Sequence, residues 1–125
     1  MREIKLESPE ELEKYLEEHK AEPVLALFTG SKDPQTGVTW CDDCERAEPF
    51  IKAAFDKLQE RTVLICEVGP REAWKNNPDN PYRKHPKTKV KGVPTLVRYE
   101  NAREMIRLEE ARLTNQSILD EVVVS

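Results

Sequence analysis

Two cysteines three positions apart lie where an apolar segment gives way to an amphipathic helix, and this junction constrains the fold more than any other feature of the sequence. The preceding segment PVLALF, residues 23–28, is a continuous apolar run typical of a central strand covered on both faces. After the cysteines, apolar residues recur at helical spacing up to position 58. We therefore expect a helix that begins at or next to Cys41, carries Cys44 one turn later and is kinked at Pro49.

Other elements can be predicted on both sides of this junction. A first helix should run from Pro9 to about Lys20, because Ser8 can cap it and Glu11 is placed for a capping box. Residues 69–91 are rich in Pro, Asn and Lys and are predicted to be irregular, with a helical turn near Ala73. Three more strands and a last helix are predicted at residues 62–68, 94–100, 103–108 and from about 114 onward.

This order of elements predicts the fold class. The strands at 94–100 and 103–108 should pair through a turn at Asn101 and Ala102, and Thr114 or Asn115 could cap the last helix. The succession helix, strand, helix, strand, irregular segment, two strands and helix implies an α/β fold with a mixed central sheet and helices on its faces. A length of 125 residues favours a single domain that spans residues 1–125.

Composition limits the classes of function. The sequence begins without an apolar stretch of signal-peptide length, and no apolar run is long enough to cross a bilayer. We therefore expect a cytoplasmic protein without membrane contact, in which the three cysteines are kept reduced and form no structural disulfide framework. The net charge of −4 argues against general nucleic-acid binding.

The cysteine pair has the spacing of a redox site. A sulfur at a helix N-terminus lies beside unpaired backbone N–H groups and the positive end of the helix dipole, which favours the thiolate that attacks disulfides. Cys44, one turn later, can then resolve the mixed disulfide formed at Cys41. One rival is a small zinc-binding domain, but the other ligand candidates Cys66, His19 and His85 lack zinc-ligand spacing. A second rival is a binding module that carries the pair without turnover.

Several motifs also resemble a known family. WCDDC at the start of a helix with an internal proline, followed by GVPT at the head of a strand, resembles the thioredoxin fold. FTGSKD before the tryptophan, CxDCxxAEP and YRK upstream of VPTL resemble more narrowly the group of thioredoxin-related 14-kDa proteins, or Clot proteins. The resemblance covers nearly the whole chain. It implies a monomeric cytosolic disulfide reductase without bound cofactor or metal, recharged by thioredoxin reductase and NADPH, that acts on small or selected protein disulfides such as cystine.

The same resemblance implies roles for individual residues. Cys41 would be the attacking nucleophile and Cys44 the resolving thiol, so that the two form the redox disulfide. Trp40 would shield the site and contact the substrate. Val93 and Pro94 would form the substrate-binding loop that faces the disulfide, with Pro94 preceded by a cis peptide bond.

Two departures from the family pattern concern charge. The family usually has a proline where this chain has Asp42, and a carboxylate beside Cys41 should raise the pKa of the thiol by like-charge repulsion. Thioredoxins also carry a buried aspartate on the central strand that moves the proton of the resolving thiol, whereas residues 24–28 are all apolar. We assign that role to Asp43.

The remaining candidates have simpler structural interpretations. Cys66 lies in an apolar strand pattern and is expected to be a buried hydrophobe. Lys89 and Lys91 belong to the basic stretch RKHPKTKVK, where either could offset the aspartates and steer anionic substrates, although charge runs are usually solvated. Trp74 fits the core and the rim of the site equally well. The resemblance further implies that the loop containing Lys32 restricts which disulfides approach.

Overall fold

A five-stranded mixed sheet forms the centre of the computed structural model, which describes residues 2–58 and 61–124. The strand order is β1-β3-β2-β4-β5, in which β1, β3 and β2 are parallel and β4 and β5 run antiparallel to their neighbours. The strands are β1 (Arg2–Leu6), β2 (Val24–Thr29), β3 (Thr62–Glu67), β4 (Thr95–Glu100) and β5 (Arg103–Glu109). The mixed sheet agrees with the fold class predicted from the sequence.

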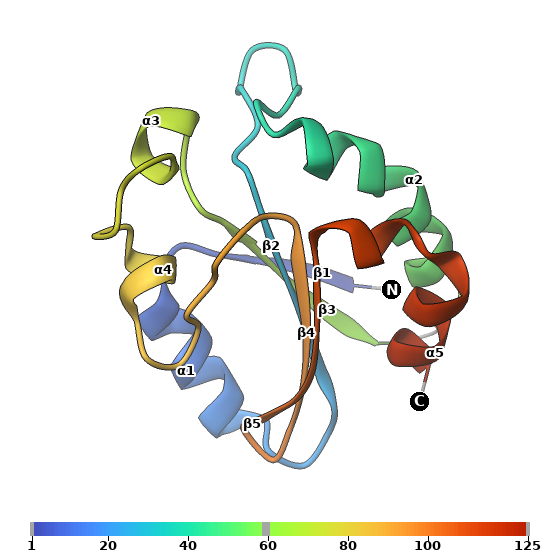
Figure 1. Ribbon diagram of the computed structural model, residues 1–125. Coiled ribbons are helices and arrows are strands. Elements are labelled where there is room, and N and C mark those ends of the chain that lie inside the picture. The colour runs from blue at the N-terminus through green and yellow to red at the C-terminus, as the bar shows by residue number, and fades with distance from the viewer. Residues whose placement is uncertain (1, 59–60, 125) are drawn as a thin grey trace.

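Helices cover both faces of the sheet, as Figure 1 shows with the sheet nearly edge-on. One face carries α1 (Pro9–Glu18), α3 (Arg71–Trp74) and α4 (Pro81–Lys84). The other carries α2 (Asp42–Phe55), the 3-10 helix η1 (Glu110–Thr114) and α5 (Gln116–Val124). Because successive strand residues point to opposite faces, β2 supplies Ala26 and Phe28 to the apolar cluster under α1 and Leu25 and Leu27 to the cluster under α2. The continuous apolar run of β2 follows from this burial on both sides.

Local signals account for the helix starts. Ser8 caps α1 by accepting a hydrogen bond from the backbone N–H of Glu11 at 3.2 Å, and the carboxylate of Glu11 accepts one from the N–H of Glu7 at 3.0 Å. Asn115 accepts a hydrogen bond from the N–H of Ile118 at 3.2 Å and so caps α5. The helix α2 begins directly after Cys41, which confirms the position predicted for it.

The predicted order of elements was wrong at the N-terminus, where β1 precedes the first helix. Only Ile4 and Leu6 are apolar in this strand, and three of its five residues are charged. Its stability comes from the edge of β3, to which it pairs from Arg2↔Thr62 to Leu6↔Cys66. Such a partner lies some sixty residues away in the sequence, so no local pattern could indicate the strand.

Two further differences concern helices. The apolar rhythm predicted that α2 would reach position 58, but the helix ends at Phe55 and Leu58 is buried in the turn that follows. The segment predicted to be irregular contains α4 in addition to α3. The helix α4 forms there because Asn80 caps it by accepting a hydrogen bond from the N–H of Tyr82 at 3.0 Å.

In the described residues, no helix combines the length and the apolar character needed to cross a membrane.

Candidate functional site

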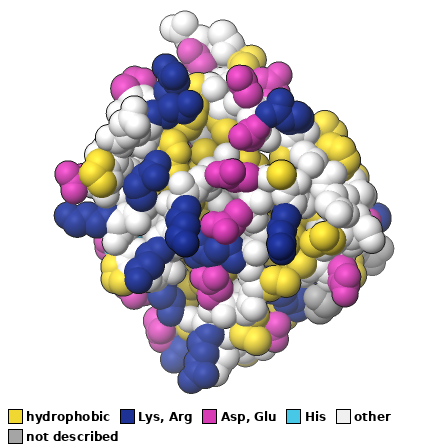
Figure 2. All heavy atoms as spheres, viewed as in Figure 1, with side chains coloured by type: hydrophobic (Ala, Val, Ile, Leu, Met, Phe, Trp, Pro, Cys, Tyr) yellow, Lys and Arg dark blue, Asp and Glu magenta, His cyan; other side chains and the backbone are white. Residues whose placement is uncertain are grey.

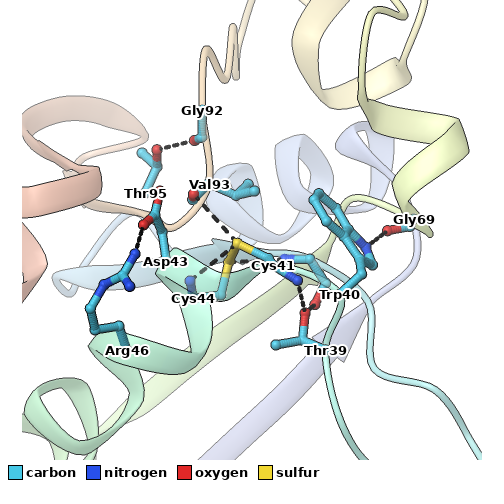
Figure 3. Close-up of a disulfide and its surroundings, with 11 residues drawn as sticks. Thr39, Trp40, Cys41, Asp43, Cys44, Arg46, Gly69, Gly92, Val93 and Thr95 are labelled. Atoms are coloured by element: carbon cyan, nitrogen blue, oxygen red, sulfur yellow. Dashed lines mark hydrogen bonds and ion pairs between the residues drawn. A yellow bond between two sulfur atoms is a disulfide. The ribbon is translucent and has the colours of Figure 1, made fainter.

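The Cys41–Cys44 pair forms a disulfide at the N-terminus of α2, with Cα atoms 5.2 Å apart (Figure 3). Cys41 is the N-cap residue, and its Sγ accepts a hydrogen bond from the backbone N–H of Cys44 at 3.1 Å. An N–H donor and the helix dipole both stabilise negative charge at this sulfur. The arrangement therefore favours Cys41 as the thiolate once the disulfide is reduced.

Thr39 and Gly30 contact the two cysteines and fix the position of the disulfide. The hydroxyl of Thr39 donates a hydrogen bond to the carbonyl of Gly30 at 3.1 Å and accepts one from the N–H of Cys41 at 3.2 Å. The N–H of Gly30 points at Sγ of Cys44 at 3.5 Å. A Cβ atom on Gly30 would lie 2.8 Å from the Cβ of Cys41, so only glycine lets the end of β2 approach the disulfide this closely.

The loop before β4 lies against the disulfide. The Val93–Pro94 peptide bond is cis, as the family resemblance implied. The carbonyl oxygen of Val93 is 3.6 Å from Sγ of Cys41, and the hydroxyl of Thr95 fixes the loop by donating a hydrogen bond to the carbonyl of Gly92 at 2.6 Å. Residues far apart in the sequence thus meet at one end of the sheet.

Two tryptophans border the site on the side away from this loop. The indole N–H of Trp40 donates a hydrogen bond to the carbonyl of Gly69 at 2.9 Å, which turns the ring away from Asp43 and Gly92 (Figure 3). Trp74 is buried and carries the guanidinium of Arg83 over its ring at 3.8 Å. Trp74 belongs both to the core and to the wall of the site, so the two interpretations of the sequence were compatible.

A polar hollow of about 610 Å³ opens beside Cys41, and we call it the front cavity. Its walls carry both signs of charge: Asp42, Asp43, Glu110, Arg46, Arg71, Lys75 and Lys91. Figure 2 shows the same mixture of charges over the whole face presented in Figure 1. Lys91 lines the front cavity and also a neighbouring hollow, which Lys89 lines with Glu104, Arg107 and Glu109.

A second hollow, the back groove, has a volume of about 500 Å³ and is lined by Cys44 but not by Cys41. Its apolar residues come from β2, β3 and α2: Leu27, Ile65, Ile51 and Phe55. Four of the charged residues around it form ion pairs, with Lys5 3.0 Å from Glu67 and Lys32 3.6 Å from Glu48, whereas Glu3, Lys52 and Asp56 also line the groove. The pair with Glu48 places Lys32 beside the first turns of α2.

The two aspartates between the cysteines differ in their partners. Asp43 forms an ion pair with Arg46 on the exposed surface of α2. Asp42 forms no ion pair with any residue in the described part of the chain. Both line the front cavity, and neither lines the back groove beside Cys44. The proton-transfer role assigned to Asp43 stays a prediction.

Cys66 is fully buried, as expected, and burial raises the pKa of its thiol to about 12. It is therefore an unreactive thiol at neutral pH.

His85 is half-buried against Glu10 and Glu13 on α1, away from the disulfide. Among residues 2–58 and 61–124, no three His, Cys, Asp or Glu side chains are arranged to hold a metal ion.

Sequence reasoning missed several residues of the site. Gly30 and Thr39 flank the long loop before the cysteines, and Glu110 contacts Gly92, which belongs to the loop that the resemblance places against the cysteines. A glycine immediately after an apolar strand was the one available signal for Gly30. Glu110 became visible only with the structure, because it reaches the site through the turn that follows β5.

Comparisons with known proteins agree with this geometry. A family profile described as "Thioredoxin domain-containing protein 17-like, thioredoxin domain" matches residues 5–125. Thioredoxin domain-containing protein 17 from Homo sapiens is 37% identical over 108 residues, which cover 86% of this chain and 85% of that protein. Thioredoxin-like protein Clot from Arabidopsis thaliana is 37% identical over 110 residues, which cover 82% of this chain and 81% of that protein.

The fold is also similar to solved structures. Thioredoxin from Fasciola hepatica superposes with a TM-score of 0.65 over 98% of this chain and 96% of its own, at 23% identity. At this level of identity the likeness shows the thioredoxin fold and nothing finer.

Proposed function

Since the chain belongs to the thioredoxin domain-containing protein 17-like family, we propose that it is a disulfide reductase in which Cys41 and Cys44 carry the electrons. The family and the cysteine pair together support a thioredoxin-like redox role. The finer proposal is that small or selected protein disulfides, such as cystine, are the substrates.

The reaction has two steps, and no bound cofactor takes part. The thiolate of Cys41 attacks one sulfur of the substrate disulfide, which forms a mixed disulfide and releases the first substrate thiolate. Cys44 then loses its proton and attacks Sγ of Cys41, which forms the internal disulfide and releases the second thiolate. Two electrons have passed from the protein to the substrate, and the oxidised product is the state seen in the structure.

The observation that carries the proposal is the hydrogen bond from the N–H of Cys44 to Sγ of Cys41 at the start of α2. This donor lowers the free energy of the Cys41 thiolate relative to the thiol, so Cys41 is the better nucleophile. Trp40 and the segment of Val93 and Pro94 are proposed to contact the substrate, because both border the disulfide. Lys91 is proposed to attract its anionic groups.

We further propose that thioredoxin reductase and NADPH recharge the protein, and that it works as a monomer in the cytoplasm. A reducing compartment favours reduction over oxidation as the working direction.

An NADPH-coupled assay with thioredoxin reductase and cystine tests the function. Wild type should consume NADPH in proportion to protein concentration, and Cys41→Ser should not. Equal rates for the two proteins would remove the catalytic proposal and leave a binding module.

A second experiment tests Asp43 as the acceptor of the proton from Cys44. A mixed disulfide is prepared at Cys41, and the release of its substrate half is followed after a jump to neutral pH. Asp43→Ala should slow this release, whereas Asp42→Ala serves as the matched control. The assignment fails if release from Asp43→Ala is as fast as from wild type.

A further inference from the structure

Glu110 places a carboxylate on the loop that borders the disulfide. Its backbone N–H donates a hydrogen bond to the carbonyl of Pro94 at 2.8 Å. A Cβ atom on Gly92 would lie 1.8 Å from Oε1 of Glu110, so the carboxylate rests directly over the Gly92 backbone. Any side chain at position 92 would displace it.

The backbone of Glu110 is unusual for a residue of this type. Its φ angle is +49°, in the left-handed region that non-glycine residues rarely adopt. The hydrogen bond to Pro94 holds this conformation and so fixes the position of Glu110 relative to the loop before β4. Because Glu110 has this conformation and Gly92 has no side chain, the carboxylate of Glu110 can lie against Gly92 in the wall of the front cavity.

Charge is distributed unevenly around this cavity. Arg71 and Lys75 come from α3 and its C-cap, on the side of Trp40 and Trp74. The opposite side, toward Gly92, carries Glu110 and Lys91 and the first residues of α2. Because Asp43 is paired with Arg46, the charge of this opposite side is set by Asp42, Glu110 and Lys91. Two carboxylates and one ammonium group set the charge there, whereas the cavity as a whole is lined by four basic and three acidic side chains.

We propose that Glu110 is a specificity-determining residue whose carboxylate binds an ammonium group carried by the disulfide substrate. The inference rests on the function proposed above and adds a preference among substrates: disulfides with an amino group near the sulfur are reduced faster than those with a carboxylate alone. Glu110 takes no part in the bond changes. It acts on the approach and binding of the substrate, through an ion pair formed beside Cys41.

The test compares three symmetric disulfides with different charges: cystamine, a dication; 3,3′-dithiodipropionate, a dianion; and 2-hydroxyethyl disulfide, which is neutral. Fully reduced protein is mixed with each probe, and the second-order rate of formation of the Cys41–Cys44 disulfide is measured by acid quenching and mass spectrometry. This design needs no reductase. It therefore separates substrate preference from recharging.

Glu110→Gln should lower the ratio of the cystamine rate to the dithiodipropionate rate about threefold to fivefold, as expected for one ion pair in a solvated cleft. The rate with the neutral probe should not change. Glu109→Gln is the matched control, because Glu109 carries the same charge one residue earlier and lines the hollow beside Lys89 but not the front cavity. The control should leave the ratio as in wild type.

Two more variants separate the effect of the Glu110 charge from the effect of the local backbone conformation. Glu110→Asn removes the charge with a residue that tolerates positive φ, and it should give the same ratio as Glu110→Gln. Gly92→Ala keeps the charge but displaces it, and it should change the ratio in the same direction by a smaller factor. An unchanged ratio in Glu110→Gln, or an equal change in Glu109→Gln, overturns the inference. Failure of wild type to react with any of the three probes would refute the reductase function itself.

Discussion

The two cysteines of the disulfide have the same exposed fraction as whole residues, 5%, but lie beside hollows of different character. Cys41 borders the front cavity, which is lined by charged residues from four parts of the chain. Cys44 borders the back groove, which has apolar residues from β2, β3 and α2 and two ion pairs among its charged residues. Exposure alone therefore does not distinguish the proposed nucleophile from the proposed resolving thiol, whereas the residues around them differ.

The same contrast appears in the hydrogen bonds. Sγ of Cys41 accepts an N–H at 3.1 Å at the end of a helix, and Sγ of Cys44 accepts the N–H of Gly30 at 3.5 Å. Shorter N–H contacts and the helix dipole favour charge on Cys41. These surroundings support the proposal that Cys41 attacks the substrate from the front cavity and that Cys44 acts in the second step.

The largest expected effect comes from removing each sulfur in turn. Cys41→Ser should lower turnover by at least about 100-fold, because no other thiolate is placed to attack. Cys44→Ser should also lose turnover, but it should accumulate a mixed disulfide at Cys41. Intact-protein mass spectrometry after incubation with cystine distinguishes the two. A mixed disulfide in Cys41→Ser, at Cys44, would reverse the assignment of roles.

A substitution at the contact between the two regions should destabilise the fold. In Gly30→Ala the new Cβ would lie 2.8 Å from the Cβ of Cys41 and 2.9 Å from Cε2 of Trp40, and both must move. We expect a loss of about 1–3 kcal/mol in the free energy of unfolding, measured with urea. Gly37→Asn is the control, because its Cβ meets open space and asparagine tolerates the φ of +73°. Equal stability of Gly30→Ala and wild type would contradict the close approach of β2 to the disulfide.

Cys66 provides the reference for a thiol that borders neither hollow. Burial raises its pKa to about 12, and burial also raises the pKa of Tyr82 and of Tyr99. In the unfolded chain these groups ionise at lower pH than in the folded protein, so the stability they contribute is fully present below pH 9 and is lost as the pH rises toward 12. Urea titrations between pH 8 and 10.5 should show a steady decline above pH 9.

The variant Cys66→Ala shows how much of this decline belongs to the thiol. Its stability should fall less steeply than that of wild type over the same range, although its stability at pH 8 is lower because a buried sulfur is lost. Parallel slopes for the two proteins would contradict a raised pKa for Cys66.

The smallest expected effect concerns Asp42. Its unpaired carboxylate beside Cys41 should oppose the thiolate, so Asp42→Pro should be alkylated by iodoacetamide about twofold to fivefold faster at pH 7. Asp43→Asn should change the rate less, because Arg46 already neutralises Asp43. Rates measured from pH 5 to 9 give the pKa of Cys41 in each protein. A pKa that is unchanged or higher in Asp42→Pro refutes the repulsion.

Much of the fold around the disulfide could be predicted from the sequence. The features that could be predicted are those that depend on residues close together in the chain. The caps of α1 and α2, the buried strand β2 and the turn at Asn101 and Ala102 are each determined by residues close together in the chain. Only the family resemblance, not the spacing, indicated the cis bond before Pro94.

The remaining features depend on long-range pairing. β1 is stabilised by β3, and the ion pair that Lys32 forms with Glu48 requires a folded loop. Glu110 reaches the front cavity only because η1 follows β5 at the edge of the sheet. Each hollow is lined by residues from several segments that are distant in the sequence. The different surroundings of the two sulfurs could therefore not be predicted before the structure was known.

The most direct test of the central claim is to map which cysteine of the reduced wild-type protein reacts first. Reduced protein is treated with substoichiometric iodoacetamide at pH 7, the remaining thiols are blocked with a second reagent, and the peptides are quantified by mass spectrometry. We predict that Cys41 carries at least about ten times more carbamidomethyl label than Cys44 or Cys66. Label found first, or equally, on Cys44 would contradict the account.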